Sequence, residues 1–217
     1  MPKVLYIPAK AKNVGIGELM SKVDIQGKFA IVSTVQFLDE VNLLKEKGYN
    51  VIGQILGCNI VSVLKSTEDC DAYLYIGTGL FHPLNLTFRV DKPVYILDPM
   101  TQEFYKLDDA LKEKYRRRQK GMLSRFYASE RVGIIVSLKS GQNNMSRALH
   151  FKKKMEEKYP KKKFYVFFCE NVGGLEDYNN IECWVNTACI RIFEDDLGVP
   201  MVNIRDLDGT AEREASV

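Results

Sequence analysis

The sequence predicts an α/β fold made of two consecutive three-layer sandwiches with mainly parallel sheets. Two observations lead to this prediction. Apolar runs of strand length alternate with helical patterns along the whole chain, which is typical of doubly wound parallel sheets. Several of these runs are nearly continuous stretches of β-branched or aromatic residues, as expected for strands that are buried on both faces of a sheet.

The predicted elements follow one another in a β–α–β–α order. The strands are Val4–Pro8, Phe29–Ser33, Val51–Leu56, Ala72–Gly77, Val94–Leu97, Val132–Ser137, Phe164–Phe168 and Trp184–Asn186. The helices between them are Ile16–Val23, Phe37–Gly48, Asp108–Ser129 and Met145–Tyr159.

The helix at Asp108–Ser129 is predicted to connect two domains. It begins with two aspartates, which favour a helix N-terminus. Its apolar residues form one stripe, and most of its lysines and arginines fall elsewhere. Because a new strand follows this helix, we expect one α/β domain over residues 1–107 and a second over residues 108–217.

Composition excludes several classes of protein. The chain has 217 residues, is 46% apolar and carries a formal net charge of +3, which is ordinary for a soluble globular protein and too weak a charge to indicate nucleic-acid binding. No apolar run approaches the length of about 18 residues that spans a membrane. The N-terminus lacks the pattern of a secretion signal. We therefore expect a cytoplasmic protein that binds neither membrane nor nucleic acid directly.

Basic runs at Lys114–Lys120, Lys152–Lys158 and Lys161–Lys163 are interpreted mainly as solvated helix faces, because no aromatic binding platform accompanies them. The alternative is a docking surface for an acidic or ribosome-associated partner.

The five cysteines, an odd number, argue against a disulfide framework, and no CxxC or similar metal motif is present. Any cluster must therefore be assembled from distant positions. The cysteines are Cys58, Cys70, Cys169, Cys183 and Cys189.

Polar, glycine and thiol residues gather where predicted strands end, which is where ligands bind in doubly wound sheets. The segments are GQILGCN (Gly53–Asn59), IGTGLFHP (Ile76–Pro83), LDPM (Leu97–Met100), SLKSGQNN (Ser137–Asn144) and VNTAC (Val185–Cys189). Each has an ordinary structural explanation as well: Gly-x-Gly occurs in many turns, His82 can cap a turn, and a buried cysteine such as Cys169 is usually inert. On physical grounds alone, the sequence indicates a ligand-binding α/β protein.

Taken in order, these motifs resemble one family, the archaeal diphthamide synthase, or 2-(3-amino-3-carboxypropyl)histidine synthase. The resemblance rests on STVQ (Ser33–Gln36), GQILGCN, DAYLYIGTGLFHP (Asp71–Pro83), VYILDP (Val94–Pro99), YRRR (Tyr115–Arg118), VGIIVSLKSGQ (Val132–Gln142) and VNTACIRI (Val185–Ile192). It covers residues 30 to 196 and implies the family's second and third domains, with the first domain absent because KVLYIPAK already resembles the first strand of the second.

The resemblance implies a [4Fe–4S] cluster with Cys58 and Cys189 as ligands and S-adenosylmethionine as substrate. A 3-amino-3-carboxypropyl group would pass to C2 of a histidine on translation elongation factor 2, by non-canonical radical chemistry. The expected S-adenosylmethionine contacts are Gly77, Thr78, Gly79, His82, Ser140, Gly141, Gln142, Asn186 and Thr187. A homodimer, an electron donor and a separate first-domain chain are the further partners implied.

Some alternatives stay open at this point. The third cluster ligand could come from an absent domain, from solvent or from Cys169. Cys183 is less suitable because it lies six residues before Cys189 on what is predicted to be one strand, about 20 Å away. The whole chain could instead be a non-catalytic partner subunit, or a nucleotide-binding α/β module without a cluster.

Overall fold

The computed structural model describes residues 5, 7–56, 70–193, 195 and 197–208. The chain divides into two compact units, one up to Lys112 and one from Glu113 onward. The division falls inside helix α5 (Asp109–Ala128), slightly after the predicted boundary at residues 107 and 108. Each unit has its own sheet and its own hydrophobic core.

The sheet of the first unit has the strand order β2-β1-β3-β4-β5. Strands β1 (Phe29–Ser33), β2 (Val51–Gln54), β3 (Ala72–Ile76) and β4 (Val94–Asp98) are parallel. Every residue of β3 is buried, as its unbroken apolar sequence predicts. Strand β5 (Glu103–Lys106) runs antiparallel to β4 and was not predicted, because three of its four residues are exposed and its sequence lacks a buried face.

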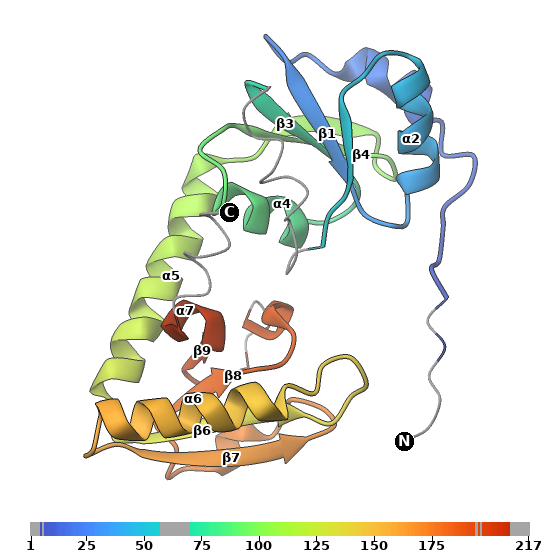
Figure 1. The fold of residues 1–217 in the computed structure, drawn as a ribbon. Coiled ribbons are helices and arrows are strands. Elements are labelled where there is room, and N and C mark those ends of the chain that lie inside the picture. Colours follow the sequence, from blue (N-terminus) through green and yellow to red (C-terminus); the bar gives the residue numbers. More distant parts are fainter. Residues whose placement is uncertain (1–4, 6, 57–69, 194, 196, 209–217) are drawn as a thin grey trace. The chain divides into compact units, whose positions relative to one another are not determined.

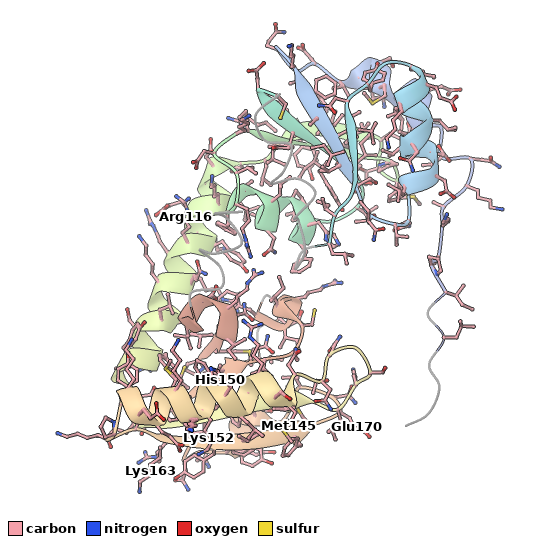
Figure 2. All side chains as sticks on the ribbon, in the orientation of Figure 1. Arg116, Met145, His150, Lys152, Lys163 and Glu170 are labelled. Carbon is pink, nitrogen blue, oxygen red and sulfur yellow. The ribbon has the colours of Figure 1, made fainter. Side chains whose placement is uncertain are left out.

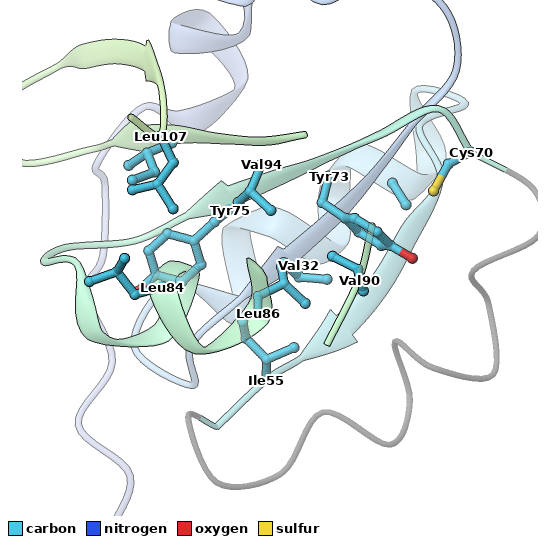
Figure 3. Packing of buried hydrophobic residues seen from close by; sticks show 12 residues of the cluster. Val32, Ile55, Cys70, Tyr73, Tyr75, Leu84, Leu86, Val90, Val94 and Leu107 are labelled. Atoms are coloured by element: carbon cyan, nitrogen blue, oxygen red, sulfur yellow. The ribbon is translucent and has the colours of Figure 1, made fainter. Parts of the chain in front are cut away.

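Helices cover both faces of this sheet. Helix α1 (Ile16–Leu19), the 3-10 turn η1 (Met20–Lys22) and helix α2 (Leu38–Glu46) pack on one face. Helix α4 (Phe81–Thr87) packs on the other, where the rings of Tyr73 and Tyr75 fill the core (Figure 3). The first unit is therefore a three-layer sandwich, as predicted.

The sheet of the second unit has the order β7-β6-β8-β9 and is entirely parallel. Its strands are β6 (Arg131–Ser137), β7 (Lys163–Cys169), β8 (Cys183–Asn186) and β9 (Met201–Asn203). Helices α5, α6 (Met145–Lys158) and α7 (Ile204–Asp208) contribute to the core on one face. The 3-10 turns η3 (Leu175–Asp177) and η4 (Ile190–Phe193), with their adjoining loops, cover the other.

The order of the strands reverses at the corresponding place in both sheets, and Figure 1 labels all four strands of the second sheet. In each, the first strand is followed by a neighbour on one side, and the third and fourth strands lie on the opposite side. The reversal lies between β1 and β3 in the first unit and between β6 and β8 in the second. Ligands bind at the carboxyl end of strands at such a switch point, so these two edges define where a site is to be sought.

The fold class is confirmed as mixed α/β with mostly parallel sheets, but one predicted strand is wrong. Of Val4–Pro8, the described residues Leu5, Ile7 and Pro8 belong to no strand, and Leu5 and Ile7 are 81% and 79% exposed. An apolar run becomes a strand only when a neighbouring strand satisfies its backbone groups, and here none pairs with the described residues of the segment. Within the described part of the chain, no helix is both long and apolar enough to cross a membrane.

Candidate functional site at the strand ends

In the second unit, the carboxyl ends of β6 and β8 are joined by a buried hydroxyl. Thr187 follows β8 directly and donates from Oγ1 to the backbone oxygen of Ile135 in β6 at 2.7 Å. Its side chain is buried together with those of Ser137 and Asn186, which end the two strands. This bond fixes the position at which the chain leaves β8.

Cys189 lies on a tight turn that Asn186 organises. The side-chain Nδ2 of Asn186 donates to the Cys189 carbonyl at 2.8 Å, and its Oδ1 accepts the Ala188 N–H at 2.9 Å. A further bond, from Nδ2 to Oδ1 of Asn203 at 2.8 Å, anchors Asn186 in the core. Cys189 itself is half-buried. The turn therefore presents a partly accessible thiol on a backbone that cannot move freely.

The loop between β6 and α6 is tied to the same turn. Asn144, which precedes α6, donates from Nδ2 to the Thr187 carbonyl at 2.6 Å. At its other end, the Leu138 N–H donates to the Cys169 carbonyl at 2.9 Å. The loop carries Gly141 with a φ of 78°, a left-handed conformation that glycine adopts without strain. The structure thus brings Ser140, Gly141 and Gln142 to the same sheet edge as Asn186, Thr187 and Cys189.

In the first unit, the switch point carries the predicted glycine turn. Ser33 ends β1 and donates to the Ile76 carbonyl at the end of β3 at 2.7 Å. A Cβ on Gly77 would lie 2.5 Å from the Tyr75 hydroxyl oxygen, so only glycine fits there. Gly79 has a φ of 73°. Gly77 is buried, and the turn exposes backbone at Thr78 and Gly79, where a ligand can approach closely.

The rings of Tyr75 and His82 lie next to this turn. The Tyr75 hydroxyl donates to the Thr78 carbonyl at 3.2 Å, and burial, followed by the negative charge of Asp98, raises the pKa of Tyr75 well above its usual range. The ring of His82 lies 6.2 Å from that of Tyr75 and 5.1 Å from that of Phe81. His82 therefore belongs to helix α4 as part of an aromatic group behind the glycine turn.

The described cysteines form two groups, one at the amino ends and one at the carboxyl ends of the strands. Cys70 and Cys183 are buried at the amino ends of β3 and β8, and burial raises the pKa of the Cys183 thiol to about 12. Cys169 ends β7, at the same edge as Cys189, and its pKa is raised by burial, partly offset by Lys139. Cys58 lies outside the described residues. Among the residues that are described, no group of three potential metal ligands is assembled.

Three supporting residues of these edges were missed by sequence reasoning: Asn144, Asn203 and Tyr75. Asn144 lies inside the predicted SLKSGQNN loop, and its place before a helix is a usable signal. Asn203 ends a strand that was too short to predict, so nothing in the sequence indicated its bond to Asn186.

Comparison with known proteins identifies the family of this chain. The family model described as "Putative diphthamide synthesis protein" matches residues 1–213. The chain belongs to this family. The resemblance inferred from the motifs is thereby confirmed.

Two archaeal relatives in the diphthamide synthesis family are named 2-(3-amino-3-carboxypropyl)histidine synthase. That of Pyrococcus horikoshii is 28% identical over 90% of this chain and 58% of its own length. That of Methanocaldococcus jannaschii is 27% identical over 78% of this chain and 46% of its own length. The chain thus spans about half the length of these curated relatives.

A solved structure from the family shares the fold. The crystal structure of Dph2 from Pyrococcus horikoshii with a 4Fe-4S cluster superposes with a TM-score of 0.74 and 25% identity, covering 93% of this chain and 63% of that one. A fungal relative from Yarrowia lipolytica, 24% identical over 76% of this chain and 40% of its own length, is named subunit 1 of the synthase.

Proposed function

We propose that this chain is the cluster-holding part of a 3-amino-3-carboxypropyl transferase in the first step of diphthamide biosynthesis. The group would pass from S-adenosylmethionine to C2 of a histidine on translation elongation factor 2, in the cytoplasm. The units before and after the division in α5 would correspond to the family's second and third domains. Support comes from family membership and from the printed names of the relatives.

The observation that carries the proposal is the fixed, half-buried thiol of Cys189 at the switch point of the second unit. Thiolates are the ligands that hold iron–sulfur clusters, and a rigid turn lowers the cost of ordering one. Cys58, which follows β2 in sequence, is the second proposed ligand. A third thiolate would come from Cys169 or from a separate first-domain chain. A bound cluster would supply the electron that cleaves the sulfonium of S-adenosylmethionine.

The residues around Cys189 have a separate task, which is to orient the substrate. The backbone N–H groups of Ser140 and Gly141 would bind a carboxylate ahead of helix α6. The Gln142 side chain would add a further bond, because the backbone N–H of this residue already donates to the Lys139 carbonyl. Asn186 and Thr187 would act by holding the turn in place. In the first unit, Thr78 and Gly79 would offer a backbone surface for the nucleoside, with Gly77 forming the buried start of the turn and His82 packed behind it.

Iron reconstitution under anaerobic conditions tests the cluster assignment. We expect Cys189→Ala to lower the iron and sulfide bound per chain and the associated visible absorbance, since an iron that loses its protein ligand is open to solvent. Cys58→Ala should do the same. Cys183→Ala is the matched control, because that thiol is buried at the opposite edge of the sheet, and it should retain iron.

The behaviour of Cys169→Ala decides the source of the third ligand. Loss of iron in this variant would assign the ligand to Cys169, whereas unchanged iron would require a thiolate from another chain. Equal iron in all variants would contradict the cluster, and the nucleotide-binding α/β module without a cluster would take its place.

Calorimetry tests the substrate contacts. Gln142→Ala should weaken anaerobic S-adenosylmethionine binding by about tenfold if one hydrogen bond to a charged group is lost. Gln26→Ala is the control, because Gln26 is exposed and its side chain bonds only Asp24 among the contacts described. Unchanged affinity in Gln142→Ala would place the ligand elsewhere.

A second candidate is a non-catalytic subunit of a larger synthase, with an electron donor and a catalytic chain as partners. The name of the relative from Yarrowia lipolytica, subunit 1, indicates a synthase with more than one chain and so allows this candidate. Group transfer to elongation factor 2 by the isolated, cluster-loaded chain would exclude this candidate; transfer only after a second chain is added would support it. The proposal also includes a homodimer.

A further inference from the structure

The second unit contains a pocket that the proposed function does not use. Its volume is about 550 Å³, and pockets of about 300 to 1,000 Å³ are typical of sites for small molecules. One face of α5, the end of η4 and the segment that leads into β9 form its walls. All the described residues that line it belong to the second unit.

The pocket extends to the amino ends of the strands. Met201, which lines it, begins β9, and β9 runs parallel to β8, which begins at Cys183. Arg125, which also lines it, lies in the last turn of α5, shortly before β6 begins at Arg131. Cys189 follows the opposite, carboxyl end of β8. The pocket is therefore distinct from the candidate site at the strand ends.

Much of the wall is apolar. Leu197, Val199 and Met201 line the pocket and pack in the hydrophobic cluster of Trp184. Met122 lines the side that α5 forms. Removing an apolar group from water against such a wall is favourable by about 25 cal/mol per Å². The pocket therefore suits a ligand with an apolar body.

Two arginines of α5 line the same pocket. Arg118, Met122 and Arg125 are spaced as i, i+4 and i+7, which places them on one stripe of the helix. The guanidinium carbon of Arg118 lies 5.0 Å from the centre of the Phe193 ring. This cation–π contact holds Arg118 against the wall.

Arg125 supplies a group that a ligand can bind. It is exposed, and its guanidinium forms neither an ion pair nor a hydrogen bond with any described residue. A guanidinium binds carboxylate, sulfonate or phosphate oxygens through parallel N–H bonds. Asp195 also lines the pocket, so two arginines and one aspartate leave a single excess positive charge among the described lining residues. This excess favours a ligand with one negative charge.

We propose that this pocket binds a small monoanion with an apolar body, such as a carboxylic acid with an alkyl or aryl part. The Arg125 guanidinium binds the carboxylate, while Met122 and the apolar residues that precede β9 cover the body. Binding at this site requires no iron and no thiol. It is measured on the chain without a cluster, so its outcome is independent of the proposed function.

Fluorescence of 1-anilinonaphthalene-8-sulfonate, an aromatic monoanion, tests the site. Arg125→Gln should raise the dissociation constant of this probe by about tenfold, because a hydrogen bond between two charged groups is lost. Circular dichroism should show an unchanged fold, since Arg125 is exposed. Arg116→Gln is the matched control: Arg116, labelled on α5 in Figure 2, is exposed and does not line the pocket. Equal affinity of Arg125→Gln and the wild type would overturn the proposal.

Competition against the same probe tests the chemical class of the ligand. Octanoate should displace the probe at a concentration at least about tenfold lower than octanol, which lacks the charge, or inorganic phosphate, which lacks the apolar body. The preference for octanoate over octanol should disappear in Arg125→Gln. Displacement by octanol as readily as by octanoate would mean an apolar surface only, and equal displacement by phosphate would mean a general anion site. Either result would contradict the assignment.

Discussion

Gly133 lies in the middle of β6, beside Trp184 of β8. A Cβ at this position would lie 2.5 Å from Cε3 and Cζ3 of the indole and 3.1 Å from Cγ2 of Ile181. Trp184 is the only tryptophan of the chain and is 1% exposed. The ring therefore has no space into which it can retreat, and the glycine is required by packing rather than by backbone conformation.

Gly133→Ala should lower the free energy of unfolding by about 2 kcal/mol, the usual cost of adding a methyl group to a filled core. Urea unfolding, monitored by the fluorescence of Trp184, measures this change in the free energy of unfolding. Gly173→Ala is the control, because its Cβ would meet nothing within 4 Å, and it should be close to neutral. A Gly133→Ala variant as stable as the wild type would mean that Trp184 repacks at little cost.

At the scale of single elements, α5 contains a glycine that packing does not require. Gly121 is exposed within the helix, and a Cβ there would meet nothing within 4 Å. Gly121→Ala should therefore stabilise the chain by up to about 1 kcal/mol, because alanine loses less backbone entropy on forming a helix. Thermal unfolding checks this. Gly48→Ala is the contrasting control: it also has open space, but its φ of 86° makes alanine unfavourable and the variant less stable.

The start of β6 depends on a carboxylate. Glu182 accepts the Glu130 N–H at 2.7 Å and forms an ion pair with Arg131. The bond from the Glu130 N–H is the main reason why the pKa of Glu182 is lowered, with Arg131 contributing less. Since the folded pKa lies below the unfolded value of about 4.3, the stabilisation is complete above that value and is lost as pH falls through the folded pKa.

Glu182→Gln should accordingly be less stable than the wild type at neutral pH, and the difference should shrink below about pH 4. Urea midpoints measured across this range test the expectation. Comparing the double variant Arg131→Gln/Glu182→Gln with the single variant Arg131→Gln separates the contribution of the backbone hydrogen bond to stability from that of the ion pair. If removing Arg131 alone abolishes the pH dependence, the backbone bond is not its main cause.

At the scale of the whole molecule, the two units have separate cores, and Trp184 belongs to the second. Gly133→Ala should therefore speed hydrogen exchange in β6 and β8 while leaving β1 and β3 unchanged, because separate cores open independently. Hydrogen exchange monitored by mass spectrometry distinguishes independent opening of the two units from cooperative unfolding of both. Equal acceleration in all four strands would show that the units unfold as one cooperative body.

The fold class, most of the strands and the family were predictable from the sequence alone. Long buried strands such as β3 and β6 were predictable because their apolar residues are contiguous. Motifs such as IGTGLFHP and VNTAC were informative because they follow those strands, and parallel strands end at one edge. The sequence could not predict β5 or β9: the first is mostly exposed, and the second has only three residues.

The contacts that hold the site in place were not predictable from the sequence. The bonds from Asn186 to Asn203 and from Asn144 to Thr187 join residues that are distant in sequence, and no local pattern encodes such pairs. The absence of a strand at the described residues Leu5, Ile7 and Pro8 has the same origin. An apolar run indicates only that burial is favourable. A strand forms only where a second segment supplies hydrogen bonds in register.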